Sequence, residues 1–473
     1  MIGPVARGRE LAGLVDEFAP AAWRRDPAWW AIIATAAAVE PWAAKLDAPY
    51  LASNAEPATD TFMAAETVAP ASCGAWCAWA VTAAHAAVRA VVELDGTLPG
   101  QPLAVTVSVV DGVARTAPVA TPWRVGFAVG ARVVGATLDP RGPAHDGALV
   151  TALADVAAGR ATALGPDPTP PLVVVAVGDD ALATLRHGHR RAWHGAAAGP
   201  WLGVARVGSL TAVTTCHLVI DGYGHARVTQ EVVGATVPAA LAAVAAAIDD
   251  RPLPRLATAH PPGTELLGVA WRHLPRLPPT LPLAYALGRV LHQRRGDPRA
   301  ARSPSFQLPV ARGAVDDPAR FAHRVRPAML AVRYVDGACE PLEAFAARAK
   351  AAIAREAGGR GIATRLLATL AVLPVPTSVK RASVRTGPTR WLRGPREHLA
   401  GDAGLSALRL PGPVALIAAS SPSPQIPRAR GNCVVTVVRH DRGATVTVAS
   451  LGRLDPTSFL DQWLAEVARV TSE

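Results

Sequence analysis

The stretch from His217 to Gly222 reads HLVIDG and has the pattern H-x-x-x-D-G. A histidine at the end of a strand can act as a general base, and an aspartate four residues later can brace the turn that presents it. A pattern this short is a hypothesis until its surroundings agree with it. The segments on either side therefore decide how it is read.

Those segments predict a strand before the motif and helices after it. Residues 209–216 contain no Pro or Gly, are rich in β-branched side chains and alternate between two faces, which is typical of a strand. Residues 222–224 (GYG) read as a breaker, followed by a helix over 225–233 and a second helix over 239–248. His217 is then expected at a strand end, where side chains tend to face a cleft.

This arrangement resembles the chloramphenicol acetyltransferase-like superfamily. Its members include dihydrolipoamide acyltransferase catalytic domains, nonribosomal peptide condensation domains, wax ester synthase-type enzymes and plant acyltransferases. Residues 125–129, 131–135 and the helix-like stretch 146–161 resemble the segment that precedes the motif in dihydrolipoamide acyltransferases, and residues 202–208 suit the strand before it.

The resemblance implies a role for each motif residue. His217 corresponds to the catalytic base that takes a proton from the acceptor, Asp221 to a structural acid paired with an arginine, and Gly222 to a tight turn whose N–H helps to hold an oxyanion. Cys216 stands where many condensation domains have a second histidine, which argues against a typical condensation domain. Two other readings stay open: a histidine satisfied structurally at a strand end with Asp221 as a helix cap, and an enzyme-like fold without activity.

The resemblance also implies the architecture, an α/β (α+β) fold. We expect a two-lobed, pseudo-dimeric chloramphenicol acetyltransferase-like fold with a tunnel between the lobes and an N-terminal helical elaboration. The expected boundaries are 1–250 for the lobe that carries the motif, 251–303 for a Pro- and Arg-rich crossover, and 304–473 for the second lobe.

Local patterns predict further elements along the chain. The second lobe lacks a D-F-G-W-G-like motif, and Gly404–Ser406 is a weak candidate for a polar segment facing the tunnel. Strands are expected over 103–111, 171–178, 413–418 and in a hairpin of 432–438 with 444–450, and helices over 281–292, 342–355 and after the Asp455 cap with its following Pro456.

Composition restricts the partners. The formal net charge is +11, yet the chain has no basic-aromatic motif of a nucleic-acid-binding module, so we expect no nucleic acid. Positive charge equally suits acyl-coenzyme A or an acidic acyl carrier protein, and arginines cluster over 294–302 and 380–396. The uncharged stretch 67–88 is read as a buried helix and no signal peptide is evident, so we expect no membrane span and a cytoplasmic location.

Cysteines and histidines give no metal or cofactor signal. The five cysteines suit a reducing compartment, and Cys73 and Cys77, one helical turn apart, are read as small buried residues. The histidines between 186 and 194 are read as part of an exposed basic loop. We therefore expect no metal and no bound cofactor, with a coenzyme A or phosphopantetheine thioester as co-substrate.

The sequence thus predicts an acyltransferase that moves an acyl group from such a thioester to a small-molecule alcohol or amine, without a covalent intermediate. The alternatives are a non-catalytic scaffold that docks a carrier on the same fold and a dihydrolipoamide-type acyltransferase. Secondary metabolism is favoured over lipid ester synthesis, although the sequence names neither substrate.

Overall fold

The architecture comes from a computed structural model of the chain. It describes, apart from isolated positions before residue 40, residues 60–68, 70–94, 104–110, 113–119, 124–129, 132–164, 173–177, 202–207, 209–216, 222–248, 268–295, 301, 303–311, 325–358, 403–420, 432–451 and 454–473.

A seven-stranded mixed sheet forms the first half of the described structure, with strand order β15-β1-β8-β7-β6-β4-β5. Parallel pairs join β4 to β6 and β6 to β7, and the remaining pairs are antiparallel. The strands are β1 (Asp60–Glu66), β4 (Arg124–Val129), β5 (Arg132–Thr137), β6 (Val173–Val177), β7 (Leu202–Val207), β8 (Leu210–Cys216) and β15 (Ile417–Ser420), and a separate hairpin joins β2 (Ala104–Val110) to β3 (Val113–Val119).

Helices cover one face of this sheet. The central helix α4 (Cys73–Leu94) is buried along most of its length and packs against α5 (Gly147–Ala157), α7 (Gly222–Gly234) and α8 (Ala239–Ala246). Its alanine-rich sequence allows neighbouring helices to approach closely, while Trp76 fills the space towards the strands. A short 3₁₀ turn, η2 (Pro143–His145), leads into α5.

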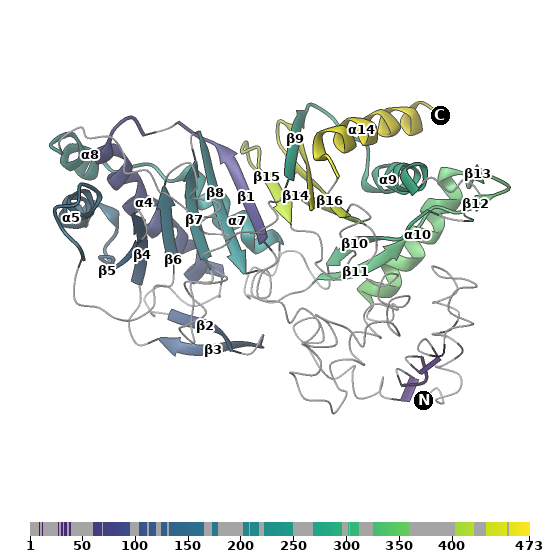
Figure 1. The fold of residues 1–473 in the computed structure, drawn as a ribbon, viewed down its shortest axis with the longest axis horizontal. Coiled ribbons are helices and arrows are strands. Elements are labelled where there is room, and N and C mark those ends of the chain that lie inside the picture. The colour runs from purple at the N-terminus through teal and green to yellow at the C-terminus, as the bar shows by residue number, and fades with distance from the viewer. Residues whose placement is uncertain are drawn as a thin grey trace.

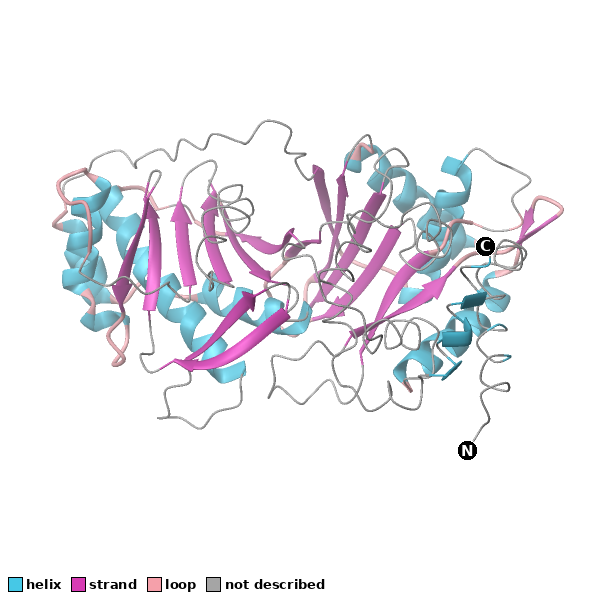
Figure 2. Ribbon diagram, turned by 60° about the horizontal axis from the view of Figure 1, so that its bottom comes forward, coloured by secondary structure: helices cyan, strands magenta, loops and turns pink. Residues whose placement is uncertain are grey.

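A six-stranded sheet forms the second half, with strand order β11-β10-β14-β16-β17-β9. Figures 1 and 2 show the two sheets side by side along the long axis of the molecule. The strands are β9 (Gly268–Leu274), β10 (Phe306–Ala311), β11 (Val325–Leu330), β14 (Ala403–Arg409), β16 (Asn432–His440) and β17 (Gly443–Leu451); the helices are α9 (Thr280–Arg295), α10 (Leu342–Ala357) and α14 (Pro456–Ser472), and a small hairpin joins β12 (Tyr334–Val335) to β13 (Ala338–Cys339).

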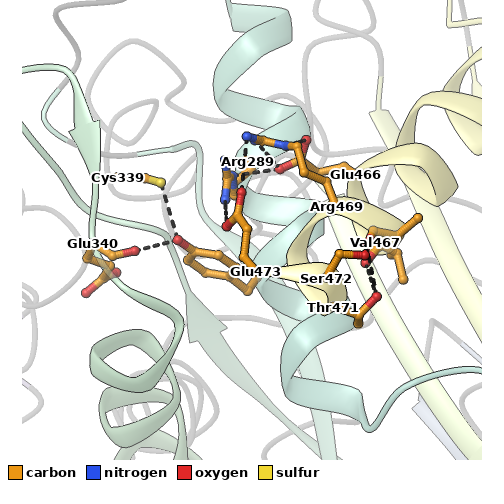
Figure 3. Close-up of polar contacts among 11 residues, drawn as sticks. Arg289, Cys339, Glu340, Glu466, Val467, Arg469, Thr471, Ser472 and Glu473 are labelled. Carbon is orange, nitrogen blue, oxygen red and sulfur yellow. Dashed lines mark hydrogen bonds and ion pairs between the residues drawn. The ribbon is translucent and has the colours of Figure 1, made fainter.

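Helix α14 is fixed to α9 by apolar and charged contacts. Trp463 is fully buried and its Nε1–H donates to the carbonyl oxygen of Leu283, 3.3 Å away. Arg289 of α9 makes a buried ion pair with Glu466 of α14, with 2.7 Å between Nε and Oε1, and also contacts Glu473 (Figure 3). These polar contacts hold α9 and α14 together over the core of the second half.

Tyr285, one turn before Arg289 on α9, extends the same network towards the small β12–β13 hairpin. Its hydroxyl donates to the carbonyl oxygen of Glu340 at 2.5 Å and lies 3.3 Å from the Cys339 sulfur (Figure 3). Burial, aided by the neighbouring thiol, raises the pKa of Tyr285 above its usual range. The hydroxyl is therefore held as a donor.

Strand β15 connects the two halves. It comes from the second half of the sequence, yet it pairs antiparallel with β1 at the edge of the first sheet. Its alternating side chains pack in two directions: Ile417 and Ala419 in one cluster with Ala449 of β17, and Ala418 in another with Val438 of β16. The first sheet is therefore completed by a strand that lies against β16 and β17 of the second sheet. In Figure 1, β15 lies between β1 and β14.

The mixed α/β class and several predicted elements are confirmed. The strands over 103–111 and 171–178, the hairpin around residue 441 and the helix over 342–355 all form. The last helix begins where its cap predicts, since the Asp455 side chain accepts hydrogen bonds from the backbone N–H groups of Thr457 and Ser458. The 67–88 segment contributes to the buried helix α4.

Other local predictions were wrong. Residues 222–224 do not break the chain but form the first turn of α7, because the first N–H groups of a helix need no acceptor inside it and tertiary contacts hold this turn. The strand expected over 413–418 lies instead at 417–420. By contrast, the helix predicted over 281–292 is confirmed and spans 280–295. Strand β9, within residues 251–303, was not predicted.

The tunnel and the domain boundaries remain predictions, and most of the expected N-terminal helical elaboration lies outside the described residues. In the part of the chain that the structure describes, no single helix is long and apolar enough to cross a membrane; α7 and α8 meet that test only as a pair bent by 58°.

Candidate functional site

The predicted motif lies between the end of one strand and the start of one helix. Strand β8 ends at Cys216 and helix α7 begins at Gly222. His217 and Asp221 fall in the connection and lie outside the described residues, so their side-chain roles stay predictions. Gly222 is described, as the first residue of α7. The strand before the motif and the helix after it are as the sequence predicts.

The first turn of α7 is anchored to β8. His225 is completely buried, and its Nε2–H donates to the carbonyl oxygen of Val213 at 2.7 Å. Thr229, one turn later, donates through its hydroxyl to the His225 carbonyl oxygen at 2.8 Å. Val228 and Val232 then enter the first core. The strand end and the helix start are therefore held at a fixed separation, which any side chain in the connection requires for precise placement.

The second sheet reaches the same place. A Cβ built on Gly222 would lie 3.5 Å from Cδ1 of Leu408 in β14, which is ordinary van der Waals contact. Tyr223 packs in the same cluster as Leu408 and Val438. The start of α7 thus lies at the seam between the two sheets. The sequence did not predict Leu408 as a neighbour, and no local pattern relates it to Gly222.

The helix start has a definite electrostatic character. The first N–H groups of a helix have no acceptor within it, and the helix dipole adds a partial positive charge at that end. Negative charge that develops beside Gly222 would be stabilised by both effects. Gly222 is half-buried, so such a charge would be partly shielded from water.

The arginine expected to pair with Asp221 is not identified. Arg206 of β7 is a buried arginine in the same sheet. Its Nη1 donates to the hydroxyls of Thr67 and Thr211, at 2.5 and 2.8 Å, and the group lies over the Trp79 ring. Burial lowers the pKa of Arg206 below its usual range. These contacts tie the start of α4 and the residues before it to the sheet.

The cysteine pair is part of the core. Cys73 and Cys77 are buried free thiols in α4. The pKa of Cys77 is raised well above its usual range, first by its hydrogen bond with Cys73 and then by burial. A thiol held protonated in this way is a poor metal ligand and a poor nucleophile. Across the described ranges, no group of three or more His, Cys, Asp or Glu could hold a metal ion, and the 186–194 histidines lie outside them.

The candidate tunnel segment and one arginine cluster are partly described. Gly404 and Ser406 lie in β14 on the face that also presents Leu408 towards the first sheet. Arg294 of the 294–302 cluster donates to Gln462 and lies over the Phe459 ring, so it contributes to the α9–α14 contact. The 380–396 cluster lies outside the described residues.

Comparison with known proteins gives structural likeness alone. No protein-family model and no curated protein matches the chain. Over nearly its whole length, the chain is similar to condensation domains and to a polyketide synthase-associated protein. The starter condensation domain of rhizomide synthetase has 11% identity and a TM-score of 0.39, with 93% of this chain and 95% of that chain covered.

Two further structures give similar values. The condensation domain that mediates chain release from the enacyloxin polyketide synthase has 13% identity and a TM-score of 0.40, covering 99% of this chain and 95% of that one. Polyketide synthase-associated protein 5 from Mycobacterium tuberculosis has 12% identity and a TM-score of 0.43, covering 90% and 97%.

Proposed function

We propose that this protein is an acyltransferase of the H-x-x-x-D-G type. It transfers an acyl group from a coenzyme A or carrier-protein thioester to a small-molecule alcohol or amine. The observation that supports this most strongly is that β8 ends just before the motif and α7 begins at its last residue, Gly222, at the seam between the two sheets.

The proposed reaction needs one base and one oxyanion site. The imidazole of His217 takes the proton from the acceptor O–H or N–H, and the acceptor attacks the thioester carbonyl carbon. The tetrahedral oxyanion is stabilised by N–H groups at the start of α7, including that of Gly222. The C–S bond then breaks, and the leaving sulfur takes the proton from the imidazolium. No acyl-enzyme forms.

The remaining parts of the proposal concern support and partners. Asp221 would brace the connection without contacting substrate. The net charge of +11 suits a donor with phosphates or an acidic carrier protein. No bound cofactor is needed, because the thioester supplies the activated acyl group.

The test is thiol release from a panel of acyl-coenzyme A donors with mixed alcohol and amine acceptors. We expect His217→Ala to lower the rate by about 100- to 10,000-fold while the protein stays folded. His145→Ala provides a matched control, since His145 is exposed in η2. Asp221→Ala is expected to lose both activity and stability. Full turnover in the His217 variant would reject the proposal.

A second set of assays tests carrier-protein donors. If wild type releases no thiol from any coenzyme A donor, acyl carrier proteins loaded with the same acyl groups replace them. Failure with both donor classes would favour a carrier-docking scaffold instead.

A further inference from the structure

Three hydroxyl side chains form a row across the second sheet. Ser406 of β14 lies beside Thr436 of β16, and Thr436 lies directly opposite Thr447 of β17. Thr447 is in turn opposite Trp271 of β9, which ends the row. Residues that share a register position lie on one face, so these side chains project in the same direction. We call Ser406, Thr436 and Thr447 the hydroxyl row.

The hydroxyl row faces the first half of the molecule. The alternate residues of the same strands, such as Val435 and Val448, lie in the core under α9 and α14. Residues on the face of the hydroxyl row, such as Val438 and Ala449, instead pack with β1 and β15. The row therefore lies in the seam between the two sheets, with apolar neighbours before and after it.

The middle of the row is buried without hydrogen-bond partners. Thr436 is 3% exposed and Thr447 is 1% exposed, and neither Oγ1 has a partner among the described residues. Thr445, the next residue of β17 on the same face, differs because its hydroxyl is 2.9 Å from Nδ1 of His273. A buried hydroxyl without a partner lowers stability, so such groups are rare in native proteins and each calls for a specific reason, such as a functional role or a water that completes it.

The hydroxyl row lies close to the candidate active site. Ser406 and Leu408 are two residues apart in β14, which corresponds to about 7 Å along a strand. Leu408 is the residue that touches the Gly222 position at the start of α7. With strands about 4.8 Å apart, Thr436 and Thr447 then lie about 8 and 12 Å from Leu408, so an extended substrate held at the start of α7 can reach the row with a group several bonds from its reacting atom.

The chemistry of the row defines what it would bind. A hydroxyl can both donate and accept a hydrogen bond, and the row contains no charged side chain. Its flanking residues on the same face include Val434, Val438 and Ala449. Such a surface suits a neutral amide or hydroxyl within an otherwise apolar chain. Ser406 and Trp271, at the two ends, are half-buried and remain partly open to solvent.

We infer that the hydroxyl row is a substrate subsite that hydrogen-bonds a neutral amide or hydroxyl of the bound molecule. This inference rests on the proposed acyl transfer for the identity of the molecule, which is either the pantetheine arm of the donor or a hydroxylated acceptor. Thr436 and Thr447 are binding residues in this assignment, and they take no part in proton transfer.

The experiment exploits the opposite effects of such residues on stability and on binding. Valine has the shape of threonine without its hydroxyl, so the Thr436→Val/Thr447→Val double variant keeps the packing. We expect its Tm to rise by about 1–3 °C in the absence of ligand. We also expect it to bind a probe about 10-fold more weakly than wild type, since two neutral hydrogen bonds are lost.

Calorimetric titration with two probes shows whether the row binds the pantetheine arm of the donor or a hydroxylated acceptor. Octanoyl-pantetheine carries amides in its arm, whereas 1,2-octanediol carries only hydroxyls. Weaker binding of the first assigns the row to the donor arm, and weaker binding of the second assigns it to the acceptor. Thr445→Val is the matched control: it removes a paired hydroxyl, so we expect a lower Tm and unchanged binding.

Three outcomes would overturn the inference. These are a lower Tm in the double variant, unchanged affinity for both probes, or no binding of either probe to wild type. The first would indicate that a structural water or protein group completes the hydroxyls. Turnover of His217→Ala tests the proposed chemistry separately, because the comparison of probe binding between wild type and the threonine variants does not depend on proton transfer.

Discussion

The two halves of the molecule join their helices to one another in different ways. In the first half, α4 approaches α8 so closely that a Cβ on Gly74 would overlap the carbonyl oxygen of Ala245. In the second half, α14 is joined to α9 by the Arg289–Glu466 ion pair and by Trp463. The first contact depends on the absence of a side chain, whereas the second depends on charged groups with partners.

This difference teaches which changes each half tolerates. A core built on close backbone approach is sensitive to added volume, because a main-chain atom cannot rotate away. A core closed by a buried ion pair is sensitive to the loss of one partner, because the other charge stays buried. The first half also contains a buried hydrogen bond, 2.6 Å between Nε2 of His85 and Oδ2 of Asp146, but that contact joins α4 to the start of α5.

The largest expected effect is in the second half. Glu466→Leu removes the nearest carboxylate from the buried Arg289 guanidinium, and among the described residues the more distant, exposed Glu473 is the carboxylate that remains, so we expect a loss of about 3 kcal/mol in the free energy of unfolding. Urea denaturation measures it. Arg289→Leu combined with Glu466→Leu should recover most of the loss, because no buried charge remains. If the double variant is no more stable than Glu466→Leu alone, the loss does not come from leaving the Arg289 charge buried without its partner.

A smaller effect is expected in the first half. Gly74→Ala should cost about 2 kcal/mol, because the new methyl meets the Ala245 backbone. Gly288→Ala in α9 is the paired test: its methyl meets side-chain atoms of the buried Val332, which can shift more easily than a main-chain oxygen, so the cost should be somewhat smaller. Gly234→Ala has open space and should cost nothing. Equal Tm values for the Gly74 and Gly288 variants would contradict the comparison.

The smallest effect concerns pH. Burial, with a contribution from His273, lowers the pKa of His440 in the folded state. Between that lowered pKa and the ordinary value of about 6.5, the unfolded chain binds more protons than the folded one. Stability should therefore fall as pH drops below about 6.5.

His440→Gln should flatten this dependence slightly between pH 6.5 and 5, as read from urea midpoints. His273→Gln should flatten it less, because burial is the larger cause. Identical profiles for wild type and His440→Gln would show that the folded state leaves this histidine unshifted.

Elements with their own local signals could be predicted from the sequence. Asp455 and Pro456 define the start of α14, and the alternation on either side of residues 441–443 defines the β16–β17 hairpin. Strand β9 had no such signal, since Arg272 and His273 interrupt its apolar residues within a Pro- and Arg-rich region. It is a strand because it pairs with β17, far away in the sequence.

In the candidate site too, features with a local sequence signal could be predicted, and features that depend on long-range packing could not. The strand and helix that flank residues 217–222 follow from local periodicity, and both are present. The proximity of Leu408 to Gly222 and the alignment of Thr436 with Thr447 depend on sheet register and on the packing of two sheets. No single-sequence pattern specifies those relationships.

Strand β15 has a consequence for biosynthesis. The first sheet receives its edge strand only when residues 417–420 have left the ribosome, although β1 has been available since residue 66. During that interval, β1 has an unpaired edge that can pair with another chain. Folding of the first half is therefore a late, non-local event, and we expect nascent or truncated chains to depend on chaperones more than their helical content would suggest.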